Sequence, residues 1–550
     1  MTENWEQAGE HRKQRKFFFG GRTARIGSTG IGANGTMSAP ALMILGTASH
    51  VGKSLLTAAF GRILSDEGYR VAPFKAQNMS LNSAATPDGR EIGRAQALQA
   101  EACRVPSRAE MNPILIKPST DTSAQVVVLG RVWREVTAAD YHQGLVEELF
   151  PVVVASYRAL AEEYDLILIE GAGSPAEINL KTHDIVNMRM AHAANATCLL
   201  VGDIDRGGVF ASLLGTVELL DDADRALIRG FIVNKFRGDR ALLDPGIEMI
   251  AERIRLPCAG VVPYLHQLGL DEEDSVALED RRTASRVWTQ DQNGSAARAL
   301  RIGVIAYPHM ANFTDFDALA EEPSIALAYV DRPQDIPAAD LLILPGSKQT
   351  LDDLQWLRQR GFSSAILDFR GRAGIFGICG GMQMLGSSIE DPAGVENNGA
   401  PRAMPGLARL GIKTILAARK VTRLVQGYLC AGFAQLVDTR FEGYEIHMGE
   451  TIYEENTSPF AEIKRQGESG SRPDGAAGEL GFVFGTYVHG LFGGDAFRHS
   501  FIAAMRARCG LPPATCYAPV GAEREGRIDR WAAHVRSSVD MDFVRSCISA

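Results

Sequence analysis

The stretch Gly46-Thr-Ala-Ser-His-Val-Gly52-Lys53-Ser54 decides the fold expected for the first half of this chain. It follows the short apolar run Ala41–Leu45 and precedes an apolar pattern of helical period. Strand, glycine loop and helix in this order are the context of a phosphate-binding loop, although five residues rather than four separate the two glycines. The backbone of this loop, with Thr47, is expected to bind nucleotide phosphates at a helix N-terminus. Lys53 is expected to reach the outer phosphates, and the Ser54 hydroxyl is expected to bind Mg²⁺.

Polar side chains end four further runs of the strand type: Lys75, Glu170, Asp203 and Asn234. Alternation of such strands with helical patterns up to about residue 265 predicts a parallel, doubly wound α/β sheet. Ligands bind beyond the carboxyl ends of such strands, so Glu170 and Asp203 are predicted metal ligands. Acidic residues at these positions also cap helices, and both interpretations stay open. Asn234 is expected to contact the base, and Lys75 a carboxylate or phosphate.

A second decisive stretch is Ile375-Phe-Gly-Ile-Cys379-Gly380-Gly381, followed by an apolar helical pattern. It places a thiol at a sharp turn between a strand and a helix, as in the nucleophile elbow of hydrolases, and predicts an exposed Cys379. The Gly380 N–H is expected to stabilise an oxyanion, with a second donor from the Gly346–Ser347 loop.

A thiol nucleophile also needs a base, and two histidines are candidates. His489 follows a strand-like run and precedes a glycine, which is typical of a base at an exposed strand end. His447, in Glu442–Gly449, is the alternative, or a substrate contact.

The remaining sequence suggests how the chain divides. We expect residues 39–280 to form the phosphate-loop domain, 281–299 a polar linker, and 300–505 the cysteine domain. Residues 1–36 are interpreted as a disordered extension or the result of an upstream start codon, and 506–550 as a helical tail.

Composition excludes several classes of protein. The 550 residues are 45% hydrophobic and 22% charged, as in globular proteins, and the net charge of −9 argues against a broad nucleic-acid surface. No apolar run approaches the roughly 20 residues that span a bilayer. The eight cysteines form no CxxC pair, which favours a cytoplasmic location over a disulfide scaffold.

A nucleotide loop and a thiol nucleophile in one chain indicate coupled chemistry. ATP converts a carboxylate to an acyl phosphate, which ammonia attacks, and a thiol that cleaves glutamine supplies the ammonia. The two halves together therefore predict a glutamine-dependent, amide-forming ligase.

The chain resembles the cobyric acid synthases, glutamine-hydrolysing amidases of cobalamin biosynthesis in the CobB/CobQ-type amidotransferase family. The resemblance runs from about residue 39 to 505. It rests on the two stretches above and on segments such as Pro73–Ser83, Glu91–Gln96, Glu170–Leu180, Asn312–Asp317 and Gly443–Gly449.

This resemblance implies a dethiobiotin-synthetase-like ATP domain fused to a flavodoxin-like class I glutamine amidotransferase domain. It implies amidation of the b, d, e and g carboxylates of adenosylcobyrinic acid a,c-diamide, with ATP and Mg²⁺. It also implies Cys379 as nucleophile and His489 as its histidine. Leu491 occupies the place where many class I glutaminases carry a glutamate, so the resemblance supplies no group that orients His489.

Three alternatives differ in testable ways. Cobyrinic acid a,c-diamide synthase shares the chemistry, but the Gln77–Ser80 segment resembles the cobyric acid synthases more closely than it resembles that enzyme. A ParA-like switch ATPase would have no glutaminase activity, and both the Cys379 elbow and the lack of a lysine between Gly46 and Gly52 argue against it. A stand-alone hydrolase would consume no ATP.

Overall fold

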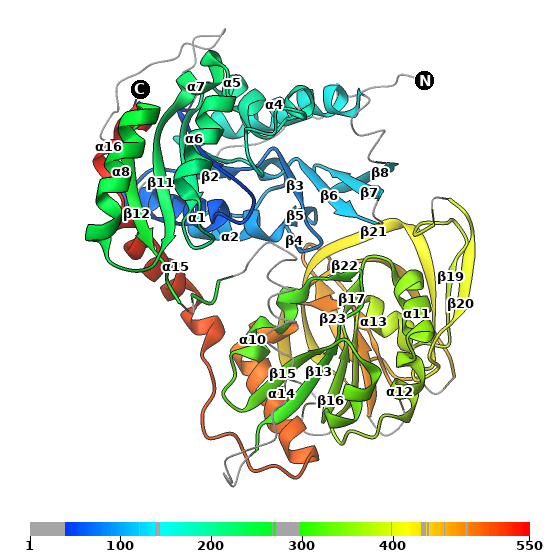
Figure 1. Cartoon of the computed structure of the whole chain (residues 1–550). Helices are drawn as coiled ribbons and strands as arrows, with labels where there is room; N and C mark the ends of the chain where they lie inside the picture. The colour runs from blue at the N-terminus through cyan, green and yellow to red at the C-terminus, as the bar shows by residue number, and fades with distance from the viewer. Residues whose placement is uncertain are drawn as a thin grey trace, which may run out of the picture.

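The computed structural model describes residues 39–119, 122–137, 144–266, 268–270, 298–397, 399–430, 436, 439–455, 457–478 and 482–549. They form two lobes, one blue to green and one green to orange in Figure 1. The expected extension 1–36 and most of the expected linker 281–299 lie outside the described residues.

The first lobe is built on a six-stranded parallel sheet. Its strand order is β12 (Cys258–Pro263), β11 (Ile228–Phe236), β10 (Thr197–Asp203), β1 (Ala41–Gly46), β9 (Leu166–Glu170) and β2 (Val71–Phe74). In the part of the chain before the second lobe, the helices of this lobe are α1 (Lys53–Asp66), α2 (Arg94–Ala102), α4 (Val146–Ala161), α5 (Met188–Ala194), α6 (Val209–Leu219), α7 (Asp222–Leu227) and α8 (Arg240–Ile254).

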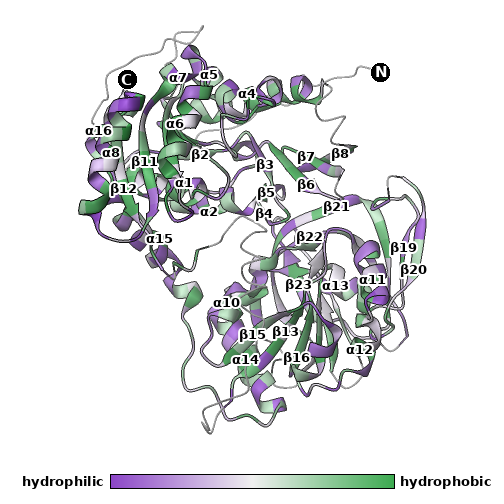
Figure 2. Ribbon diagram, in the orientation of Figure 1, coloured by the Kyte–Doolittle hydropathy of each residue, from purple (hydrophilic) through white to green (hydrophobic). Residues whose placement is uncertain are grey.

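Alternate residues of β1 enter different cores because side chains along a strand point to opposite faces. Met43 and Leu45 pack in the core that contains residues of α4 to α8. Leu42 and Ile44 pack in the core on the other face, with residues of α1. In Figure 2 the strands of this sheet are largely green, whereas the helices around it carry both green and purple residues. The predicted α/β fold with a parallel sheet is confirmed here.

Smaller strands of this lobe reach toward the second lobe (Figure 1). They form a four-stranded sheet and a hairpin: β3 (Gln77–Met79), β6 (Ile114–Pro118), β7 (Ser123–Val128) and β8 (Arg131–Thr137), then β4 (Ser83–Ala85) with β5 (Glu91–Gly93).

The second lobe contains a six-stranded sheet that is parallel except at one edge. Its order is β15 (Ile325–Val330), β13 (Leu300–Ile305), β16 (Leu341–Leu344), β18 (Gly374–Ile378), β26 (Val483–Thr486) and β25 (Ala476–Ala477). Its helices are α10 (Asp317–Ala320), α11 (Thr350–Gln359), α12 (Phe362–Asp368), α13 (Gly380–Leu385) and α14 (Asp495–Arg508).

A second, seven-stranded sheet of this lobe lies next to the first lobe (Figure 1). It contains β19 (Ser388–Asp391), β20 (Arg402–Pro405), β21 (Ile412–Leu429), β22 (Arg440–Tyr453), β23 (Ala461–Arg465), β24 (Ser471–Asp474) and β27 (Val488–His489). A short antiparallel pair, β14 (Met310–Ala311) and β17 (Gly346–Ser347), completes the described strands.

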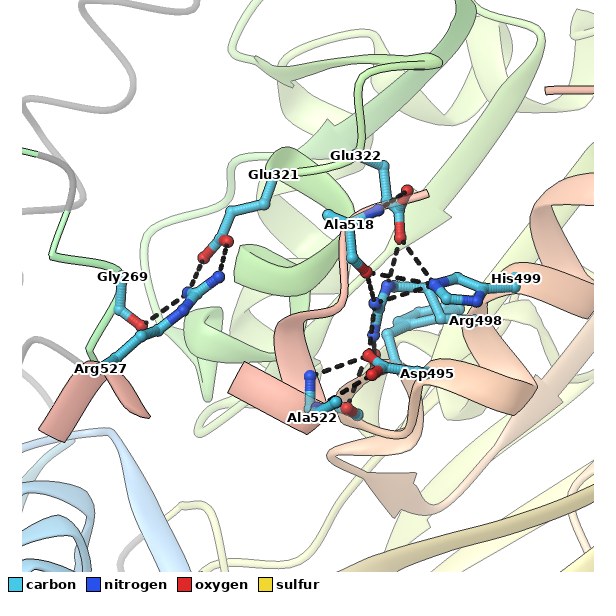
Figure 3. Close-up of polar contacts among 12 residues, drawn as sticks. Gly269, Glu321, Glu322, Asp495, Arg498, His499, Ala518, Ala522 and Arg527 are labelled. Carbon is cyan, nitrogen blue, oxygen red and sulfur yellow. Dashed lines mark hydrogen bonds and ion pairs between the residues drawn. The ribbon is translucent and has the colours of Figure 1, made fainter. Parts of the chain in front are cut away.

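The C-terminal segment returns to the first lobe as α15 (Val520–Arg536) and α16 (Met541–Ser549), red in Figure 1. Apolar residues of both helices belong to the same core as α1, and the Trp531 Nε1–H donates to the Leu55 carbonyl at 2.6 Å. In its middle, α15 also contacts the second lobe, because Arg527 forms a paired ion contact with Glu321 at 2.5 and 2.7 Å (Figure 3). The C-terminal segment therefore contacts both lobes and connects them.

Candidate active site

The phosphate-binding loop follows the central strand β1 and requires glycine at two positions. Gly52 has a φ of +97°, and a Cβ there would lie 2.2 Å from the Asn234 amide nitrogen. A Cβ on Gly46 would lie 2.7 Å from the Lys53 ammonium. Asn234 donates to the Val51 carbonyl at 2.8 Å, so this predicted base contact also supports the loop. Thr47 donates its backbone N–H to the Val201 carbonyl at 2.9 Å.

Glu170, at the end of β9, is buried beside this loop and accepts hydrogen bonds from several side chains. It accepts hydrogen bonds from the Ser54 hydroxyl at 2.7 Å and from Lys75 Nζ at 2.9 Å. Gln99 of α2 donates to its other oxygen at 2.6 Å. Burial alone would raise the pKa of Glu170, but the Lys75 ammonium and these hydrogen bonds hold it below its usual value. The carboxylate is therefore ionised at neutral pH.

Asp203, at the end of the neighbouring strand β10, forms a separate ion pair. Its Oδ2 lies 2.9 Å from Lys235 Nζ, which also donates to the His50 carbonyl at 2.6 Å. Asp203, Glu170 and Ser54 border one cavity. In the described part of the chain no three His, Cys, Asp or Glu side chains cluster as a metal cage. One or two carboxylates beside a phosphate loop suit Mg²⁺, which keeps waters and phosphate oxygens as its other ligands.

Cys379 occupies the elbow that the sequence predicts, directly after β18. Its φ of 51° and ψ of −111° are rare for a residue with a side chain. Such backbone strain at a nucleophile turns the side chain out of the strand. Its N–H donates to the Thr486 carbonyl at 2.7 Å, and its thiol faces the Ile446 carbonyl at 3.7 Å.

The three predicted oxyanion residues lie together at this elbow. A Cβ on Gly380 would lie 2.9 Å from the Ser347 nitrogen, so the elbow and the Gly346–Ser347 loop are in close contact. A Cβ on Gly346 would lie 3.0 Å from His489 Cε1. The carboxyl ends of the adjacent strands β16, β18 and β26 thus bring loop, nucleophile and histidine to one place.

His489 is held by Asp315, a residue that the sequence analysis did not single out. The His489 Nδ1–H donates to Asp315 Oδ2 at 2.7 Å, and the Gly490 N–H donates to Oδ1 at 2.9 Å. Burial alone would lower the pKa of His489, but the charge and hydrogen bond of Asp315, together with Cys379, raise it to about 10. The only available sequence signal was the Asn312–Asp317 motif, which points to no role by itself.

The expectation that Cys379 and His489 are exposed needs correction. His489 is 1% exposed and Cys379 7%, so both are more buried than an open elbow or a free strand end would leave them. The reason is packing, since Tyr444 stacks on the His489 ring with centroids 5.6 Å apart. His447 is also buried, and both of its ring nitrogens are engaged, by the Gly449 carbonyl at 2.9 Å and by Glu445 at 3.2 Å. These contacts favour His489 over His447 as the base.

The phosphate-binding loop and the residues next to His489 face the same cavity of about 2230 Å³. Lys53, Glu170 and Asp203 border it from the first lobe, while Asp315 and Gly490 border it from the second. Apolar side chains also line this cavity: Met79, Leu265, Trp531, Phe441 and Phe497. The cavity is large enough for a nucleotide and a second large substrate.

Two family models match the two lobes. Residues 42–276 match the CobQ/CobB/MinD/ParA nucleotide binding domain. Residues 301–497 match the CobB/CobQ-like glutamine amidotransferase domain. In the described part of the chain, no helix has both the length and the apolar character needed to cross a membrane.

Whole-length relatives carry both lobes. The chain is 48% identical over 501 residues to a cobyric acid synthase of Desulforudis audaxviator, covering 90% of this chain and 96% of that protein. It is 45% identical over 507 residues to that of Moorella thermoacetica, covering 92% and 96%. It is 45% identical over 512 residues to that of Salmonella heidelberg, covering 92% and 97%.

Proposed function

Because the chain belongs to the cobyric acid synthase family, a family of glutamine-hydrolysing amidoligases, we propose that it converts adenosylcobyrinic acid a,c-diamide to adenosylcobyric acid. The reaction amidates the b, d, e and g carboxylates, each through an acyl phosphate formed from ATP. The observation that carries this proposal is the cavity between the two lobes. The phosphate-binding loop borders it on one side, and Asp315, the hydrogen-bond partner of His489, borders it on the other.

In the glutaminase half, the raised pKa of His489 favours an imidazolium. Cys379 reacts as its thiolate, because the thiolate is the nucleophilic form of a thiol. The thiolate attacks the carboxamide carbon of glutamine, and the negative charge on oxygen is stabilised by the N–H groups of Ser347 and Gly380. His489 gives its proton to the departing ammonia, which leaves a thioester. Neutral His489 then takes a proton from the water that hydrolyses the thioester to glutamate.

In the synthetase half, Lys53 and the backbone of Gly46–Ser54 would hold the ATP phosphates, with Asn234 near the base. Ser54, Glu170 and Asp203 would hold Mg²⁺, which offsets the charge of the phosphates. Lys75 would contact a substrate carboxylate or the transferred phosphoryl group. Ammonia attacks the acyl phosphate carbon and phosphate leaves, which completes one amide.

Two variants and one substrate test this division of labour. With the a,c-diamide, ATP and glutamine, product masses should show four added amide groups, whereas an a,c-diamide synthase would add none to this substrate. Cys379→Ala should abolish glutamine-dependent amidation and retain turnover with ammonium salt. Lys53→Ala should stop amidation with either nitrogen source. Loss of ammonia-dependent turnover in Cys379→Ala, or normal turnover in Lys53→Ala, would overturn the assignment of the two halves.

A further inference from the structure

One contact of the interface reaches the catalytic histidine from the other lobe. Arg94, the first residue of α2, donates from Nη2 to the Tyr444 hydroxyl. Its guanidinium carbon also lies 4.9 Å from the centroid of the Tyr444 ring, within the range of a cation–π contact. Tyr444 is 6% exposed and is the cross-strand partner of His489 between β22 and β27. A single side chain thus separates a residue of the nucleotide lobe from the histidine of the glutaminase.

Neighbouring contacts join the same part of the first lobe to residues that lie next to Cys379 and His489. Ala85 of β4 packs in one apolar cluster with Tyr444 and Ile446. The Ile446 carbonyl faces the Cys379 thiol at 3.7 Å. Ser83, also of β4, donates its N–H to the Asn312 side chain at 3.0 Å, three residues before Asp315. Strand β22 therefore contacts the β4–β5 hairpin and the start of α2, and the segment that carries Asp315 contacts the same hairpin.

The first two turns of α2 also contact the phosphate-loop site. Gln99 donates to Glu170 at 2.6 Å and to the Ser54 carbonyl at 3.2 Å. Gln96, one turn earlier, donates to Glu170 at 3.5 Å. Arg94 and Gln99 are separated by about 7.5 Å along the helix axis, at 1.5 Å per residue. A short helix moves as a unit, so a displacement of Glu170 would also displace Arg94 through α2.

We propose that Arg94 and Tyr444 are positioning residues for His489, and that α2 transmits occupancy of the nucleotide site to the glutaminase. The inference rests on the proposed function. Contacts of Glu170 with bound nucleotide and metal would fix α2 through Gln96 and Gln99. Arg94 would then hold Tyr444, and the stacked ring would hold His489 in the orientation that Asp315 also favours. Glutamine would thus be hydrolysed fastest when a carboxylate is ready for ammonia.

The test compares glutamate release with and without ATP and the a,c-diamide in Arg94→Met, which keeps length and removes charge. We expect the stimulation of glutaminase kcat to fall by about fivefold or more, the range of coupling between sites, at an unchanged KM for glutamine. Tyr444→Phe keeps the stack on His489 and loses the hydroxyl contact with Arg94, so it should lose stimulation to the same extent as Arg94→Met. Turnover with ammonium salt should persist in both variants, which also shows that they fold.

Arg423→Met is the matched control, because Arg423 crosses the same interface to the Gly89 carbonyl at 3.2 Å and contacts neither catalytic residue. It should keep full stimulation. Arg94 and Tyr444 also border the cavity, so a parallel loss of ammonia-dependent turnover or a raised KM for the corrinoid would overturn the proposal in favour of substrate binding. Unchanged stimulation in Arg94→Met, or none in the native protein, would overturn it too. If the native protein forms no cobyric acid at all, the proposed function has failed instead.

Discussion

Asp315 Oδ2 lies 2.7 Å from Nδ1 of His489, although the two residues are 174 positions apart in the chain. Both side chains are almost fully buried, at 2% and 1% exposure. A carboxylate on Nδ1 leaves Nε2 as the ring nitrogen that exchanges protons with thiol, ammonia and water. Asp315 therefore orients His489, whereas Leu491 stands at the position where many class I glutaminases carry a glutamate.

Asp315→Asn should impair the glutaminase selectively. An amide in place of the carboxylate stabilises the wrong tautomer of His489 and removes the charge that supports its imidazolium, with losses up to about 10⁴-fold in comparable triads. Glutamate release would fall, whereas amidation with ammonium salt would continue. Asp331→Asn, at a partly exposed position that does not border the cavity, should change neither rate. A glutaminase that tolerates Asp315→Asn would remove this residue from the mechanism.

The same pair should make stability depend on pH. The pKa of His489 is about 10 in the folded chain and about 6.5 when unfolded, so folding binds a proton between these values. The stabilisation is fully present below pH 6.5 and disappears as pH rises toward 10. Urea unfolding of the native chain and Asp315→Asn should therefore differ most at low pH and converge toward pH 10. Introducing Asp315→Asn into His489→Gln should abolish that pH-dependent difference, and its persistence would locate the titrating group elsewhere.

Glu170→Gln should affect both metal dependence and stability. The amide is a weaker ligand for Mg²⁺, so the Mg²⁺ concentration for half-maximal amidation should rise by about tenfold or more. Lys75 would lose the partner of a buried ion pair, which typically costs about 3–5 kcal/mol in the free energy of unfolding. Magnesium titrations of ammonia-dependent turnover measure the first effect and urea unfolding the second. Glu162→Gln, exposed at the end of α4, is the control, and an unchanged magnesium titration in Glu170→Gln would exclude the metal role.

Trp531→Ala should destabilise the first lobe, although Trp531 belongs to the C-terminal segment. Its ring is 5% exposed in the core shared with α1, and truncation of a buried tryptophan costs about 3–5 kcal/mol. Arg530→Ala, on the exposed face of the same helix, should change the free energy of unfolding by less than about 0.5 kcal/mol. Equal urea midpoints for the two variants would show that α15 adds no stability.

The chain's local patterns predicted the parts of the fold that depend on neighbours in sequence. The glycine loop before Lys53 and the elbow at Cys379 are short stretches whose backbone conformation is dictated by their own residues. Parallel strands bring their carboxyl ends to one edge, so the sequence predicts Glu170 and Asp203 at the edge of the sheet that carries the phosphate-binding loop. These features are local or follow from a general rule of sheets.

Other features required the packed chain. Asp315 meets His489, Arg94 meets Tyr444, and Trp531 meets the first turn of α1 across 174, 350 and 476 positions. No periodicity marks such pairs, because each side chain would be equally compatible with solvent in its own segment. Burial of His489 likewise depends on the ring that stacks on it from another strand. Hydrophobic packing brings the segments together, and only then does the energetic cost of leaving a buried polar group without a partner select which side chains pair.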